Sequence, residues 1–130
     1  MGLPIEEKIS VTTTGSAASA TGNTTSEILL NGYLLGFRVD YHASAPATTD
    51  VTITSVLPSG QPADTLLTLT NINTDIPYRP VLRADYVPAN TASGTFSIMP
   101  LPNHKINVAV AGSDALTDCV TVWVIYTKDL

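Results

Sequence analysis

The chain has 130 residues, which is enough for one domain of ordinary size and too few for two. Its formal net charge is −5 with only six Lys and Arg residues, and this balance disfavours nucleic-acid binding, which needs a basic face. Charged residues make up 13% of the chain and hydrophobic residues 44%, so the composition excludes general disorder and disfavours a conventional monomer with a well-charged surface.

The first quarter of the chain differs from the rest. Residues 5–13 alternate through Ile9 and Val11, as a half-buried strand does. Residues 12–26 follow as an uncharged run of Thr, Ser, Ala, Gly and Asn, which cannot bury enough apolar surface to order itself. Either the fold ties this tract down as strands and a long hairpin, or a partner chain holds it.

We therefore divide the chain into an N-terminal strand and arm, residues 1–26, and a β domain, residues 27–130. An extended arm can add a strand to a neighbouring sheet edge. On this hypothesis the arm contacts another subunit through Ile5, Ile9 and Val11.

Short strands with a period of two are predicted along the rest of the chain. Glu27 to Leu30 leads into Asn31-Gly32, a strong hairpin-turn signal. In residues 33–41 the pattern places Leu35 and Phe37 on one face and Leu34 on the other. Further strands are predicted at residues 51–56, 65–70, 80–84, 94–99, 105–111 and 120–126.

The last of these strands is apolar on both faces, which predicts a central strand covered on two sides, with Trp123 in the core beside Phe37. Nine Pro and eight Gly residues interrupt the chain too often for an amphipathic helix. The sequence therefore predicts an all-β fold, a single antiparallel β-sandwich of about eight strands with an extended N-terminal arm. Both jelly-roll and immunoglobulin-like topologies fit it.

The cysteine content and the termini bear on the compartment. Cys119 is the single cysteine, so no intrachain disulfide forms, and its place in an apolar strand predicts a buried small hydrophobe. No apolar leader and no window long enough to span a membrane is visible, so we expect synthesis in a cytoplasm and no membrane partner.

No constellation of residues points to catalysis, and we expect no enzyme, no cofactor and no metal. There is no nucleophile elbow, P-loop or dinucleotide fingerprint, and the glycines around Tyr33 are interpreted as structural. Asp40 and His42 share a strand face, and Asp114 and Asp118 flank a turn. Chance and turn stabilisation explain these pairs better than metal binding does.

A small group of aromatic and basic residues is the remaining candidate site. Tyr78, Arg79, Arg83 and Tyr86 lie in a proline-rich part of the chain, and Tyr and Arg are enriched at protein interfaces. We interpret them as a partner interface. A carbohydrate platform, with Tyr78 and Tyr86 exposed and coplanar, is the alternative.

Three segments resemble small structural proteins of tailed bacteriophages. They are residues 35–53, residues 66–80, and residues 105–112 with the valine-rich strand that follows. The resemblance covers about three quarters of the chain, leaves out residues 1–26, and rests on strand features, so it carries no functional residue over.

The resemblance implies a capsid decoration or cement protein on the outside of the virion. Such a protein would bind the major capsid protein and its own copies, as a trimer or another oligomer. On this reading, deleting residues 2–26 should leave a folded domain that no longer binds capsids. The alternative function is a receptor- or glycan-binding module of a phage fibre, tail or neck.

Overall fold

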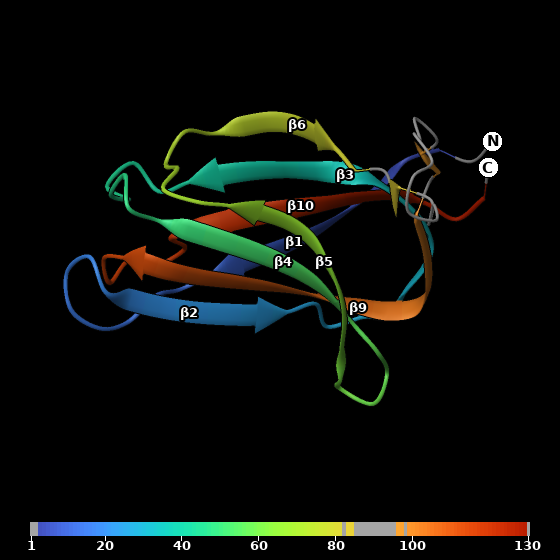
Figure 1. Cartoon of the computed structure of the whole chain (residues 1–130), viewed down its shortest axis with the longest axis horizontal. Helices are drawn as coiled ribbons and strands as arrows, with labels where there is room; N and C mark the ends of the chain where they lie inside the picture. Colours follow the sequence, from blue (N-terminus) through green and yellow to red (C-terminus); the bar gives the residue numbers. More distant parts are fainter. Residues whose placement is uncertain (1–2, 82, 85–95, 98, 130) are drawn as a thin grey trace, which may run out of the picture.

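The computed structural model describes residues 3–81, 83–84, 96–97 and 99–129. All regular structure in these residues is antiparallel β, as the sequence predicts (Figure 1). The strands are β1 (Ile5–Val11), β2 (Ala20–Thr25), β3 (Leu30–Tyr41), β4 (Asp50–Val56), β5 (Pro62–Leu69), β6 (Ile76–Pro80), β7 (Arg83–Ala84), β8 (Phe96–Ser97), β9 (Met99–Ser113) and β10 (Val120–Thr127).

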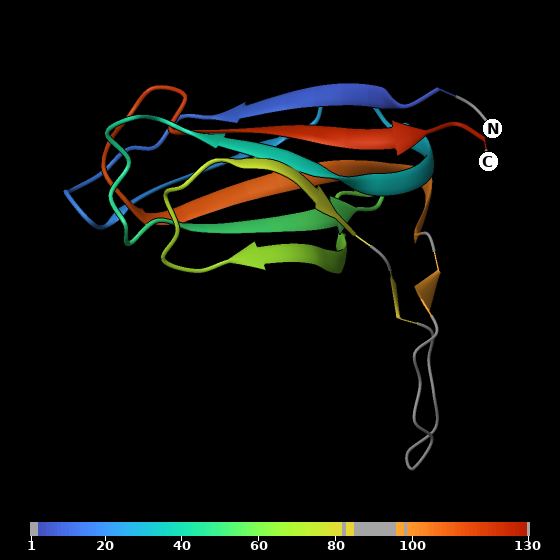
Figure 2. The ribbon, with the colours of Figure 1, turned by 90° about the horizontal axis from the view of Figure 1, so that it is seen from above.

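Eight of the strands form two layers. We call β1-β10-β3-β6 the first sheet and β2-β9-β4-β5 the second sheet. The two sheets are joined at one corner, where the beginning of β3 pairs with the beginning of β9. Figure 2 shows the layers from above, with β7 and β8 leading away from them as a separate ladder.

The order of pairing distinguishes the two topologies that the sequence left open. With β7 and β8 set aside, the first strand pairs with the last (β1 with β10), and the second with the last but one (β2 with β9). Inside these lie β3 with β6 and β4 with β5. Pairs of strands that are successively closer in sequence thus alternate between the two sheets, which is the jelly-roll arrangement. In the immunoglobulin fold the first two strands share a sheet, whereas here β1 and β2 lie in different sheets.

The core lies between the two sheets and follows the alternation of the strands. On β4, Val51 and Ile53 are buried, and on β9 Ile106, Val108 and Val110 are buried, as predicted. The inner face of β10 contributes Val120, Val122, Val124 and Tyr126. At about 25 cal/mol per Å² of apolar surface, burial of these side chains is the main favourable term holding the layers together.

The N-terminal tract is part of this sandwich. β1 pairs with β10 along its whole length, and β2 pairs with β9. The hydroxyl of Thr13 donates to the carbonyl oxygen of Asp114 at 2.6 Å, and Ala20 is fully buried. The fold itself thus orders this tract, the first of the two possibilities that the sequence allowed.

A β-bulge changes the predicted register of β3. Tyr126 of β10 lies opposite Leu34 and Ile125 lies opposite Gly36, so Leu35 is an extra residue without a partner. The faces therefore exchange at this point: Leu34 is fully buried and Leu35 is partly exposed. The prediction that Leu35 shares the inner face with Phe37 is wrong, because strict alternation does not survive an inserted residue.

The predicted hairpin at Asn31-Gly32 is also wrong. Both residues lie inside β3, and the chain turns earlier, in residues 26–29. A Cβ atom at Gly32 would clash with the carbonyl oxygen of Thr127, so this glycine serves a close approach between backbones. His104 also lies in this region, within β9, where it pairs with Leu30 of β3.

Candidate interaction surfaces

The outer face of the second sheet carries two rows of small uncharged side chains. The register aligns Asn23, Ala109, Thr52 and Thr68 in one row across four strands, and Thr25, Asn107, Thr54 and Thr65 in the next. All eight side chains are exposed or partly exposed. We call these eight residues the threonine face. These two rows are free of charge, although the chain carries a net charge of −5.

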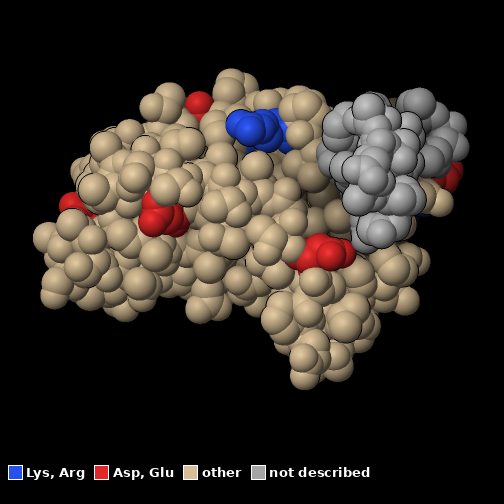
Figure 3. Space-filling view, in the orientation of Figure 1, with Lys and Arg blue, Asp and Glu red and all other residues tan. Residues whose placement is uncertain are grey.

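Hydrogen bonds fix part of this face. The side-chain amide of Asn107 donates to the Thr25 hydroxyl at 2.9 Å and to the Asn23 side-chain oxygen at 3.4 Å. The charged neighbours Asp50 and Lys105 lie outside the two rows, level with Ala111 and Val56. Figure 3 shows a view in which charged side chains stand far apart on a largely uncharged surface.

The outer face of the first sheet is different, and its centre is Trp123. The guanidinium of Arg38, on β3, stacks 3.8 Å from the centre of the indole ring, and the Lys8 ammonium, on β1, lies 5.8 Å away. Asp40 pairs with Arg38 at 3.8 Å. Trp123 is only partly buried, so the prediction that it belongs to the core is wrong. Its neighbours Val122 and Val124 point inward, and alternation turns Trp123 outward.

The three predicted contact residues of β1 lie on its inner face. Ile9 and Val11 are buried in the domain's own core, and Ile5 packs partly buried against it. Since these side chains already fill the sandwich, we correct the prediction that Ile9 and Val11 contact another subunit. Their pairing partners are Val122 and Val120 of β10.

The predicted aromatic and basic group is only partly within the described structure. Tyr78, on β6, is 49% exposed, and its hydroxyl donates to the carbonyl oxygen of Leu35 at 3.2 Å. Its ring lies against Gly36, where a Cβ atom would have no room. Arg79 is exposed on the same strand. Arg83 begins β7, and Tyr86 lies outside the described residues, so coplanarity with Tyr78 stays a prediction.

The carboxylates and His42 are engaged in local structure. The Asp114 carboxylate accepts a hydrogen bond from the Ala18 amide at 2.9 Å, which ties the β1–β2 turn to the β9–β10 turn. His42 Nδ1 accepts from the Ser44 amide at 3.0 Å. Within the described ranges no cluster of three or more His, Cys, Asp or Glu side chains is placed to hold a metal ion.

Cys119 and Tyr41 each carry a polar group that is buried in the sandwich. Cys119 is fully buried, with its sulfur 3.2 Å from the Ser113 hydroxyl, as predicted for a packed small residue. The Tyr41 hydroxyl is buried and has no hydrogen-bond partner in the part of the chain described here. Burial, and secondarily the charge of Asp75, raises the pKa of Tyr41 to about 12.

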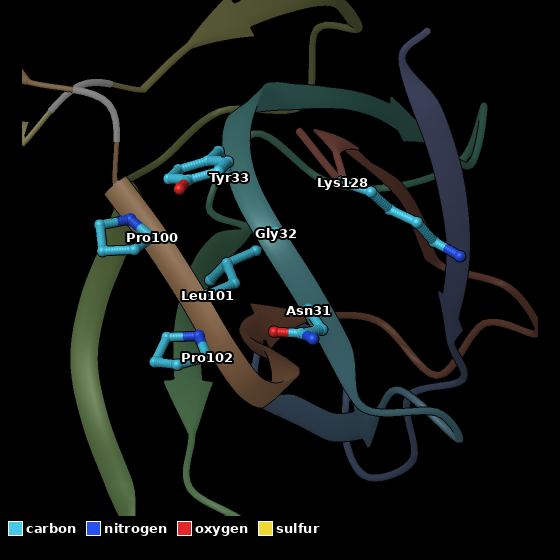
Figure 4. Close-up of a pocket in the computed structure, with 7 residues that line it drawn as sticks. All are labelled: Asn31, Gly32, Tyr33, Pro100, Leu101, Pro102 and Lys128. Atoms are coloured by element: carbon cyan, nitrogen blue, oxygen red, sulfur yellow. The ribbon is translucent and has the colours of Figure 1, made fainter. Parts of the chain in front are cut away.

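A shallow hollow of about 210 Å³ lies at the corner where β3 meets β9. Figure 4 shows Tyr33, Pro100 and Pro102 on one side of it, while the Lys128 ammonium points away from them. The hollow is open to solvent, whereas small-molecule sites are enclosed clefts lined mostly by apolar side chains. Among the described residues no helix could cross a membrane.

Comparison with known proteins gives no relative from which a role could be transferred: no family model and no curated protein matches this chain. The fold and its surfaces define an all-β jelly-roll domain whose outer faces differ, with charged side chains around Trp123 on one and the uncharged threonine face on the other.

Proposed function

We propose that this chain is a structural subunit of a tailed-phage virion, a decoration protein that binds the outside of the major capsid protein shell and also its own copies. The threonine face is the observation that carries the proposal. The resemblance of residues 35–53, 66–80 and 105–112 to phage structural proteins supports the same class.

An uncharged sheet face suits attachment to a protein shell. Burying a charged side chain without a partner costs several kcal/mol, whereas hydroxyl and amide groups can exchange water for hydrogen bonds with a partner at little net cost. Thr and Asn hydroxyl and amide groups supply donors and acceptors across both rows of the threonine face. Thr is also β-branched, so its ordering on binding costs little rotamer freedom.

The experiment is a co-sedimentation assay with expanded heads of the phage that encodes the chain. Ala109 lies at the centre of the threonine face, between Asn23 and Thr52, so Ala109→Arg introduces a charge where the shell would dock. Thr121→Arg, on the outer face of the first sheet, is the matched control.

We expect the wild-type chain and Thr121→Arg to sediment with the heads, and Ala109→Arg to bind at least tenfold more weakly. Circular dichroism checks that both variants are folded. Equal binding of Ala109→Arg, or a wild-type chain that stays in the supernatant, contradicts the proposal.

A glycan- or receptor-binding module is the second candidate, and Tyr78 favours it. The hydrogen bond from its hydroxyl group to the carbonyl oxygen of Leu35 holds the half-exposed ring in place. The stacked side chains of Arg38 and Trp123 lie on the same sheet. A glycan array separates the two functions: a glycan that binds the wild-type chain and not Tyr78→Ala supports this candidate, and an empty array opposes it.

A further inference from the structure

The sandwich has four outer strands, and two of them protect each other. β1 and β2 belong to different sheets but lie close together on one side of the molecule. The backbone of Thr12 approaches Gly22 so closely that a Cβ atom there would clash with it, and Thr14 forms a bridge with Thr21. The chain itself therefore covers this side of the sandwich.

The other side carries the outer strands β5 and β6, and β6 is protected by its sequence. Pro77 and Pro80 lack the amide hydrogen that a further strand would need, and Arg79 adds a charge. Prolines and charges of this kind are the usual means by which an edge strand avoids pairing with another chain.

The second half of β5 has neither the prolines nor the charges that protect β6. Residues 65–69, Thr-Leu-Leu-Thr-Leu, contain no proline, glycine or charge, and within the described structure β5 pairs with β4 alone. Leu66 and Leu69 are buried, whereas Leu67 packs at the rim of the core and stays partly exposed. An additional strand here would satisfy backbone groups and complete the burial of Leu67.

We propose that β5 pairs antiparallel with β5 of a second copy of this chain, centred on Leu67, so that the second sheets of two copies become one continuous sheet. Two chains of net charge −5 repel each other, and residues 65–69 offer an approach without charge. Antiparallel pairing of a strand with itself is a closed twofold contact, in which each Leu67 lies opposite the other. This pairing deepens the proposed function, because it names the surface through which copies of the chain bind each other.

Cross-linking tests the pairing in the absence of capsids, so that its failure is distinct from a failure of head binding. Leu67→Cys places one thiol on each strand at the twofold axis, and Tyr78→Cys is the matched control on the other exposed edge. The native Cys119 is buried and gives no background. We expect a short bismaleimide to yield a covalent dimer from Leu67→Cys and none from Tyr78→Cys.

Sedimentation equilibrium of chains without an introduced cysteine gives the second measurement. We expect the wild-type chain at twice its mass of 13.7 kDa, and Leu67→Lys to raise the dimer dissociation constant at least tenfold, with Tyr78→Lys unchanged. Circular dichroism confirms that Leu67→Lys is folded. A monomeric wild-type chain, a trimer, equal cross-linking of both cysteine variants, or cross-links to a capsid protein alone would each overturn the pairing.

Discussion

The two sheets of this sandwich have equivalent inner faces and contrasting outer faces. Inward, both present alternating Val, Ile and Leu side chains to a common core. Outward, the first sheet carries Lys8, Arg38 and Asp40 around Trp123, whereas both rows of the threonine face lack charge. The edges differ in the same way, since prolines and Arg79 protect β6 and nothing similar protects residues 65–69 of β5.

This contrast shows which part of the surface lacks charged side chains. A uniform surface with 13% charged residues would be sparsely charged everywhere, but here the first sheet carries mixed charges around Trp123, whereas Asp50, Asp64 and Lys105 of the second sheet lie outside the two rows of the threonine face. A protein that keeps one face solvated and another uncharged has a preferred side for packing against neighbours. If the sheets share one apolar core and differ in the charge of their outer faces, substitutions inside and outside the sandwich should have different effects on stability.

The largest effect is expected from removing one strand of each sheet. The sequence alone predicts that a chain without residues 2–26 stays folded, but these residues contain β1 and β2, which pair with β10 and β9. Their deletion removes both strands and the buried Ile9 and Val11 from the core, and should abolish cooperative unfolding in a thermal melt followed by circular dichroism. A chain that starts at Pro4 loses only residues before β1, including Leu3, which is 87% exposed, and should melt like the wild type. Cooperative unfolding of the shorter chain would mean that the two strands are appendages after all.

The outer faces should differ in their contribution to stability. Trp123→Ala removes the ring that Arg38 and Lys8 cover, and we expect it to lower the free energy of unfolding by about 2 kcal/mol from lost burial and cation–π attraction. Thr52→Ala, at the centre of the threonine face, should change it by less than about 0.5 kcal/mol. Urea denaturation measures both, and similar losses would remove the distinction between the faces.

Much of the inner structure could be predicted from the sequence, because burial on one side imposes a period of two. The strands at residues 51–56, 105–111 and 120–126 follow this period without interruption and are confirmed. The prediction was wrong where a residue is inserted, as at Leu35, since the bulge depends on the neighbouring strand β10. Trp123 shows a related limit: apolar residues on both faces of its strand suggested the core, but alternation along the strand places Trp123 on the outer face.

The surfaces depend on pairings between distant segments, and these were beyond sequence reasoning. Thr52 and Thr54 are visible as an alternating pair, but their rows are completed by Asn23, Thr68 and Ala109 from three other strands. The same non-local information distinguishes a jelly roll from an immunoglobulin-like sandwich and shows that, within the described residues, β5 pairs with β4 alone. Low complexity in residues 12–26 left open whether the fold or a partner chain orders them, and hydrogen bonds to β9 and the last turn show that the fold does.

The smallest predicted effect concerns the interior that the two sheets share. Burial and the Asp75 carboxylate raise the pKa of Tyr41 to about 12, from 10.0 in the unfolded chain. Above pH 10 the unfolded state loses the phenolic proton first, so the stability due to the neutral hydroxyl is complete below pH 10 and is lost as the pH rises towards 12. Each pH unit in this window costs at most about 1.4 kcal/mol.

Tyr41→Phe removes both this pH dependence and a buried hydroxyl without a partner among the described residues. At neutral pH we expect the variant to be about 1 kcal/mol more stable than the wild type. Urea denaturation at pH 8, 10 and 11 should show its advantage growing above pH 10. An advantage that stays constant with pH would mean that the Tyr41 hydroxyl ionises as easily in the folded protein as in the unfolded chain, and that the interior between the sheets is open to water at this point.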